Sequence, residues 1–239
     1  MKNLRSFLLL LLFSTGTVQL FAHALWIETP GTGKKGQPQE VKIFYGEYAS
    51  NEREQLSEWY SDVKEFTLWL TAPGKEKVQL SKTPGTDFYS ASFIPEQDGV
   101  YLLTVSHVAK DLGGTTKYEF SSVAAVAVGK TSVVDHRSIP NTISVLAGEA
   151  RTYKMNATVQ LKAVLNGQPL ANKPVSVFSP EGWSKEFITD ANGHVAFTPL
   201  WPGRYVLELS NFEKTTGTHN GQAYTAAWQG ATSSLEVSK

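Results

Sequence analysis

The sequence has 239 residues, with 22 Lys and Arg, 22 Asp and Glu, and no cysteine. This charge balance argues against a nucleic-acid-binding protein, which carries a basic surface. The missing cysteines exclude disulfides, thiolate metal sites and cysteine nucleophiles. A hydrophobic content of 41% with 11% aromatic residues predicts a globular fold, and the length allows one or two domains.

The first 22 residues have the pattern of a secretory signal peptide. Lys2 and Arg5 precede the apolar run 7–13, and a more polar stretch follows. The run is too short for a transmembrane helix, which needs about 20 apolar residues, and no later segment reaches that length. We therefore expect a cleaved signal peptide (1–22), a periplasmic or otherwise exported protein, and no transmembrane segment in the mature chain. Loss of Lys2 and Arg5 leaves 20 basic against 22 acidic residues.

Two cleavage positions fit the sequence. A cut after Ala22 makes His23 the first residue of the mature chain. A cut after Ala24 satisfies the small-x-small preference through Ala22 and Ala24, and it removes His23.

The chain from residue 23 to 129 alternates between short apolar segments and turns. This spacing is typical of a β-sandwich. Segment 51–60 is the exception, because its charged composition fits either a short helix or an exposed loop. The expected strands cover 41–45, 66–70, 88–93, 100–105 and 122–128.

A less regular connector covers 130–156, and a second alternating region follows from 157 to 239. Asn166-Gly167 is a strong turn signal, because both residues tolerate positive φ. We therefore predict an all-β protein with two Ig-like or transthyretin-like sandwiches, 23–129 and 157–239. Strands are expected at 157–164, 173–178, 194–197 and 204–209.

The second region resembles the transthyretin-like or carboxypeptidase-regulatory-like β-sandwich. The resemblance rests on segments 166–171 (NGQPLA), 189–193 (TDANG) and 202–205 (PGRY). The whole mature chain resembles a family of exported bacterial proteins associated with nickel or cobalt uptake (NikM-like). The residues that carry this resemblance are 22–28 (AHALWIE), the second β-region, and the tail 217–224 (GTHNGQAY). It implies a periplasmic protein that serves a membrane metal-uptake transporter, and it favours cleavage after Ala22.

Five histidines are the obvious candidate ligands, but none forms an HxH, HxxxH or HExxH motif. If His23 is the N-terminus, its α-amine and imidazole can chelate one ion together. His107 follows an apolar strand, and His219 lies in a Gly- and Thr-rich loop. Such nitrogen donors suit Ni(II), Co(II) or Cu(II), and Glu47 is a candidate oxygen ligand. His136 and His194 are expected at the surface.

Motifs of enzymes are absent: there is no G-x-S-x-G, G-x-G-x-x-G or Walker sequence. We therefore expect a binding protein and not an enzyme, with a divalent transition metal as its cargo. Two alternatives stay open, a structural adaptor without metal and a carbohydrate-binding protein. Candidate sugar-stacking residues are Trp59, Tyr60, Trp183, Trp201 and Trp228.

Overall fold

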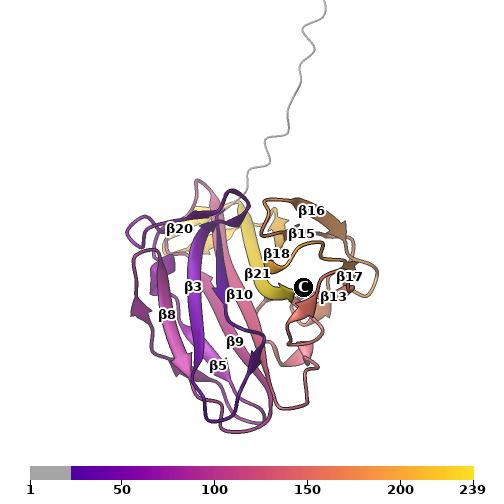
Figure 1. Ribbon diagram of the computed structural model, residues 1–239. Coiled ribbons are helices and arrows are strands. Elements are labelled where there is room, and N and C mark those ends of the chain that lie inside the picture. Colours follow the sequence, from indigo (N-terminus) through magenta and orange to yellow (C-terminus); the bar gives the residue numbers. More distant parts are fainter. Residues whose placement is uncertain (1–22) are drawn as a thin grey trace, which may run out of the picture.

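The computed structural model describes residues 23–239, so the predicted signal peptide (1–22) lies outside the described residues. Strands dominate this part of the chain, which confirms the all-β prediction (Figure 1). Helical structure among the described residues is limited to three short 3₁₀ turns, η1 (Tyr48–Ser50), η2 (Val63–Glu65) and η3 (His136–Ser138). No helix in residues 23–239 is long and apolar enough to cross a membrane.

One sheet is built entirely from the N-terminal part of the chain. Its antiparallel order is β1-β3-β8-β7, and β4 adds to the end of β3. The strands are β1 (Ala24–Glu28), β3 (Gln39–Glu47), β4 (Glu52–Arg53), β7 (Thr83–Pro84) and β8 (Phe88–Phe93).

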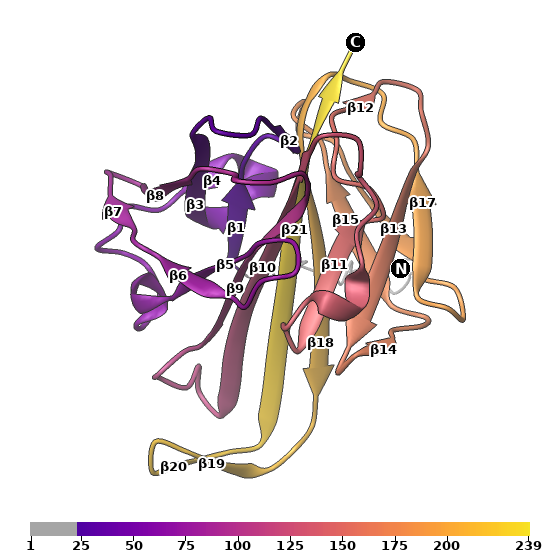
Figure 2. The same cartoon turned by 90° about the horizontal axis from the view of Figure 1, so that it is seen from below.

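A ten-stranded sheet joins the two halves of the chain. Its order is β16-β15-β18-β21-β10-β9-β5-β6, and the central pair β10 and β21 runs parallel. Figure 2 shows this pair side by side between the two groups of strands. The strands are β2 (Thr32–Gly33), β5 (Leu68–Thr71), β6 (Val78–Leu80), β9 (Gly99–Val108), β10 (Thr116–Val128), β12 (Tyr153–Lys154), β15 (Pro174–Phe178), β16 (Ser184–Ile188), β18 (Gly203–Glu213) and β21 (Ala226–Ser238).

A third sheet and a separate hairpin complete the fold. The third sheet has the order β11-β13-β14, with β17 also paired to β13. The hairpin β19-β20 projects between the ends of β18 and β21. These strands are β11 (Ile143–Ala147), β13 (Val159–Leu165), β14 (Gln168–Pro169), β17 (His194–Phe197), β19 (Gly217–His219) and β20 (Gln222–Tyr224).

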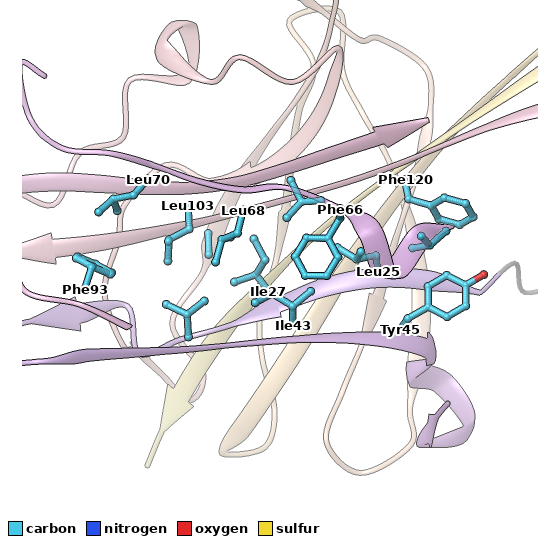
Figure 3. Close-up of a cluster of buried hydrophobic side chains, with 14 of the residues drawn as sticks. Leu25, Ile27, Ile43, Tyr45, Phe66, Leu68, Leu70, Phe93, Leu103 and Phe120 are labelled. Carbon is cyan, nitrogen blue, oxygen red and sulfur yellow. The ribbon is translucent and has the colours of Figure 1, made fainter. Parts of the chain in front are cut away.

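Two large hydrophobic clusters lie on opposite halves of the shared sheet. The first, drawn in Figure 3, packs β1 and β3 against β5, β9 and β10. The second packs β11, β13 and β17 against β15, β18 and β21. Each cluster follows from alternating apolar residues, because every second side chain of a strand points to the same face. Strands from before and after the predicted connector 130–156 pair in this one ten-stranded sheet. The division into two domains therefore stays a prediction.

Strand β1 is held on both sides, which fixes the start of the described chain. It pairs with β3 along one edge. Along the other edge, the Thr232 and Ser234 hydroxyls donate hydrogen bonds to the carbonyls of Leu25 (2.6 Å) and Ile27 (2.7 Å). The Ile27 amide donates to the Ser122 hydroxyl at 3.1 Å. Leu25 and Trp26 are almost fully buried, so the start of β1 is anchored in the interior of the protein.

Most local predictions agree with this fold, but three places differ. The predicted connector 130–156 is one of them, because it contains β11 and β12, and β11 is buried in the second hydrophobic cluster. The Asn166-Gly167 turn has the expected positive φ values of 51° and 74°. Segment 51–60 forms neither of the predicted alternatives in full, because β4 begins it and Trp59 near its end is buried. His136, in η3, is half-buried and not exposed as predicted. Its Nδ1 is buried and has no hydrogen-bond partner among the described residues. His194 is exposed as expected.

Candidate metal-binding site

The four predicted ligand residues lie at the same end of the strands. β1 begins opposite the end of β3, so His23 and Glu47 are placed close to that end. β10 and β21 both begin there, at Thr116 and Ala226. His107 sits near the end of β9, and His219 ends β19 in the hairpin that precedes β21. The sheet topology therefore gathers residues that are far apart in the sequence.

His23 comes directly before β1 and is fixed by two contacts. Its Nε2 lies 2.8 Å from Oε1 of Glu54. Its ring stacks on Tyr45 with a centroid distance of 5.8 Å and an interplanar angle of 20°. The side chain of His23 is 40% exposed and that of Glu54 is 18% exposed, so the imidazole is held firmly but can still be reached from solvent.

Glu54 reaches His23 because β4 folds back onto the end of β3. Gly46, at φ 148°, permits this approach, since a Cβ there would collide with the carbonyl oxygen of Glu52. The Glu54 amide donates to the Tyr45 carbonyl at 3.0 Å, and the Trp59 indole donates to the Glu54 carbonyl at 3.1 Å. Burial raises the pKa of the Glu54 carboxyl, while the charge of a protonated His23 would lower it.

Tyr45 lies at the boundary between this pair and the hydrophobic core. It packs against Trp59 and Phe120, and Figure 3 shows Tyr45 and Phe120 at one end of the core. Burial raises the pKa of the Tyr45 hydroxyl well above its usual value, and the nearby Glu54 carboxylate raises it further. Tyr45 therefore stays neutral and acts as an aromatic wall for His23.

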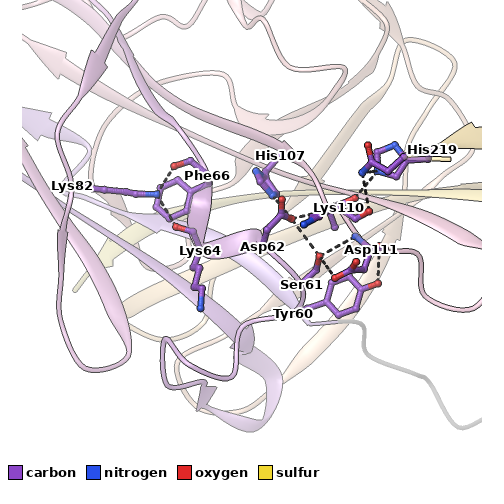
Figure 4. Close-up of polar contacts among 12 residues, drawn as sticks. Tyr60, Ser61, Asp62, Lys64, Phe66, Lys82, His107, Lys110, Asp111 and His219 are labelled. Atoms are coloured by element: carbon purple, nitrogen blue, oxygen red, sulfur yellow. Dashed lines mark hydrogen bonds and ion pairs between the residues drawn. The ribbon is translucent and has the colours of Figure 1, made fainter. Parts of the chain in front are cut away.

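His107 makes a second imidazole–carboxylate pair. Its Nε2 lies 2.9 Å from Oδ1 of Asp62, and the same oxygen accepts the Lys110 amide at 2.8 Å (Figure 4). Burial works to raise the pKa of Asp62, but the hydrogen bonds from His107 and Lys110 outweigh it and hold this pKa below its usual value. Ser61 and Asp111 extend the network, with the Ser61 hydroxyl donating to the Asp111 carboxylate at 2.9 Å.

His219 contacts the loop that follows β9. Its Nε2 lies 2.9 Å from the Ala109 carbonyl oxygen, two residues beyond His107. The tight turn between β19 and β20 permits this contact, since Asn220 and Gly221 adopt positive φ values of 49° and 80°. The Asn220 amide group adds a hydrogen bond to the Lys110 carbonyl at 3.1 Å.

The structure therefore brings the predicted ligands together only in part. His219 contacts the loop that follows His107, through the Ala109 carbonyl, whereas His23 is held separately by Glu54. Glu47 lies opposite Glu52 in the β3-β4 pair. Among residues 23–239 no group of three His, Asp or Glu side chains is arranged to hold a metal ion. The four-residue ligand set His23, His107, His219 and Glu47 thus stays a prediction.

One feature is common to the three histidines. In each of them Nε2 faces an oxygen acceptor: Glu54, Asp62 or the Ala109 carbonyl. A neutral ring that donates through Nε2 carries its lone pair on Nδ1. Metal-binding histidines commonly use their second nitrogen in this way. Sequence reasoning missed Glu54 and Asp62, because both lie in a charged segment without a local motif.

The aromatic candidates for sugar binding have different surroundings. Trp59 is buried in the first core, and Tyr60 and Trp228 pack against the same core. Trp183 and Trp201 are half-buried neighbours, with ring centroids 6.1 Å apart and an interplanar angle of 55°. Trp59 is therefore unsuited to the predicted stacking role, because other side chains cover its ring.

Comparison with known proteins gives a family and distant structural neighbours. No curated protein matches the chain significantly. The fibronectin(III)-like modules of CbhA from Clostridium thermocellum share 12% identity, with a TM-score of 0.25 over 89% of this chain and 94% of that one. Salmonella alpha-2-macroglobulin reacted with methylamine shares 10% identity, with a TM-score of 0.27 over 90% of this chain, which spans 15% of that protein. Residues 20–212 match the domain of unknown function DUF4198, and the chain belongs to this family.

Proposed function

We propose that this protein is an exported binding protein for a divalent transition metal. The expected ion is nickel or cobalt, with copper as an alternative. The site is centred on His23 as the N-terminal residue of the mature chain. The observation that carries the proposal is the 2.8 Å contact between His23 Nε2 and Glu54. It leaves Nδ1 as the nitrogen that can coordinate.

The chemistry of such a terminus suits these metals. After cleavage at Ala22, the α-amine and Nδ1 of His23 close a six-membered ring around one ion. The amine loses its proton near neutral pH more easily than a lysine does. Two nitrogen donors favour Cu(II), Ni(II) and Co(II) over Mg(II) or Ca(II), which prefer oxygen ligands.

The surroundings of His23 support this use. Strand β1 is clamped between β3 and β21, so the donor atoms are presented from a fixed strand. A fixed donor loses less conformational entropy on binding than a free terminus does. His107 and His219, at the same end of the strands, are the proposed sources of further ligands.

The wider role follows from the sequence resemblances. We place the protein in the periplasm as a NikM-like component that supplies a membrane metal-uptake transporter, without enzymatic activity. Its layout is proposed as two sandwiches, 23–129 and a transthyretin-like 157–239. The separate hydrophobic clusters on the two halves of the ten-stranded sheet support this layout.

Two measurements test the proposal. Mass spectrometry of the exported protein should find His23 as the first residue, and a chain that starts at Leu25 would refute the N-terminal site. Calorimetric titration with Ni(II), Co(II) and Cu(II) should show binding that His23→Ala abolishes. His194→Ala is the matched control, because His194 is exposed on β17. Absence of binding to the unaltered protein would favour the adaptor alternative.

Carbohydrate binding is a second candidate, which the Trp183–Trp201 pair favours. Half-exposed tryptophans can stack on sugar rings, although the 55° angle between these two rings offers no flat platform. Titration with soluble oligosaccharides, followed by tryptophan fluorescence, should respond to Trp183→Ala if this role is correct. An unchanged spectrum in the unaltered protein would exclude this candidate.

A further inference from the structure

We propose that Glu54 is the positioning residue of this site, which sets the tautomer and orientation of the His23 ring so that Nδ1 and the α-amine face one metal ion. The inference rests on the proposed function. It adds the residue that selects the coordinating nitrogen. Glu54 itself is not a ligand in this arrangement, since its carboxylate contacts the ring nitrogen opposite the metal.

The Glu54 carboxylate is placed rigidly. The backbone of Glu54 is tied to Tyr45 on one side and to the Trp59 indole on the other, at 3.0 and 3.1 Å. Its side chain is only 18% exposed. Such a carboxylate cannot turn away into solvent without leaving its packing site, so its contact with His23 persists.

The second carboxylate oxygen of Glu54 indicates that this residue has a role other than packing. Oε2 of Glu54 is buried and has no hydrogen-bond partner within residues 23–239. Buried polar atoms are nearly always paired in folded proteins, and an exception calls for an explanation. Holding an imidazole in one orientation explains why a carboxylate stands here and not an apolar side chain.

The His23 ring is restrained in two directions. Stacking on Tyr45 at 20° limits the tilt of the ring. The hydrogen bond to Oε1 limits rotation about the Cβ–Cγ bond, because a flipped ring would present a carbon in place of Nε2. Together these contacts leave Nδ1 as the lone-pair nitrogen on the side of the main-chain nitrogen, to which it is linked through only three carbon atoms. Other protein carboxylates orient metal-binding histidines in the same way.

The test uses chain 23–239, prepared with a free α-amine on His23 and titrated with Cu(II) or Ni(II) at pH 8. Glu54→Ala should weaken binding about 10- to 100-fold. Glu54→Gln, which keeps an oxygen acceptor, should lose less. Glu52→Ala is the matched control, because Glu52 is exposed and pairs opposite Glu47. It should bind as the unaltered chain does.

A second readout follows the ring without metal. Nitrogen NMR of ¹⁵N-histidine-labelled protein should show His23 as a single tautomer protonated on Nε2, identified by its loss in His23→Ala. Glu54→Ala should give a mixture of the two tautomers, while circular dichroism confirms that the variant is folded. Should Glu54→Ala fail to fold, the Glu54→Gln spectrum and affinity decide.

The outcomes separate the two claims. If Glu54→Ala and Glu54→Gln bind metal within twofold of the unaltered chain, with an unchanged tautomer, the positioning role is wrong and the metal function stands. If the unaltered chain binds no metal, the proposed function is wrong, and the positioning role in metal binding falls with it. The NMR spectra then still report whether Glu54 orients the ring.

Discussion

The Thr232 hydroxyl donates a hydrogen bond to the Leu25 carbonyl at 2.6 Å, and the two residues are 207 positions apart. Both groups are buried. The bond ties the first described strand to the last one. It places the start of β1, and with it His23, against the shared ten-stranded sheet.

Replacing Thr232 by Val removes this hydroxyl at nearly constant volume. The buried Leu25 carbonyl then loses its donor, and we expect the free energy of unfolding to fall by about 1–2 kcal/mol. Urea unfolding at pH 7 measures the loss. The control is Thr225→Val, where an exposed hydroxyl bonds to Thr115 and a change within about 0.5 kcal/mol is expected. Equal falls in the free energy of unfolding for the two variants would show that the hydrogen bond from Thr232 to β1 is unimportant.

His136 should make the protein sensitive to acid. Burial lowers its pKa from 6.5 to about 4, helped by the positive charges of Lys162 and of a protonated His194, while Asp135 acts in the opposite direction. The unfolded chain therefore binds a proton that the folded chain refuses, so stability falls as the pH drops below 6.5 towards 4. Because the site is partly solvated, the loss at pH 5 should be about 1 kcal/mol.

The variant His136→Gln removes this titration and should flatten the stability profile between pH 7.5 and pH 5. His194→Gln keeps His136 and removes only one of the smaller causes of its pKa shift, so it should reduce the acid loss less than His136→Gln does. Denaturant unfolding at both pH values measures the difference. An unchanged acid loss in His136→Gln would assign that loss to other groups.

Glu208 should have the opposite pH dependence. Burial raises its pKa from 4.5 to about 7, and the nearby Glu47 adds to the shift. The folded chain keeps the Glu208 proton to a higher pH than the unfolded chain does. The stabilisation that comes from this proton is therefore complete below pH 4.5 and is lost as the pH rises through 7. Glu208→Gln should therefore stabilise the protein at pH 8 by about 1 kcal/mol and change little at pH 4.5.

Thermal unfolding at the two pH values tests this expectation. Glu186→Gln is the matched control, since Glu186 is exposed on the outer strand β16 and both residues lie beside Ser176. A gain in Glu186→Gln of the same size would indicate a general charge effect and not the burial of Glu208.

Asp62 should control the order of the loop 109–111, which follows His107 in the chain and contacts His219. Its Oδ1 accepts the Lys110 amide at 2.8 Å, so Asp62→Ala should speed hydrogen exchange at that amide. The Asp111 amide is held by the Ser61 hydroxyl at 3.0 Å and should change less. Equal exchange at Lys110 with and without Asp62 would contradict the role of this carboxylate.

The strands were predictable because their signal is local. Alternation in 159–165 and the Asn166-Gly167 turn depend on neighbouring residues, and the structure has both. The parallel pairing of β10 with β21 was not predictable, since it joins segments about 110 residues apart. Non-local pairing also explains the missed residues Glu54 and Asp62. Their partners His23 and His107 lie elsewhere in the sequence, and a charged segment looks solvated when read alone.

The central claim is that the His23 amine and imidazole bind one metal ion together. Its most direct test compares Cu(II) and Ni(II) titrations at pH 7 of chain 23–239 with a free α-amine and of the same chain acetylated on that amine. Both chains carry the same imidazole, but in the acetylated one the nitrogen of His23 is an amide and no other amine stands beside it. We expect tight binding by the first chain and a loss of at least about tenfold in the second. Equal affinities for the two chains would contradict this claim.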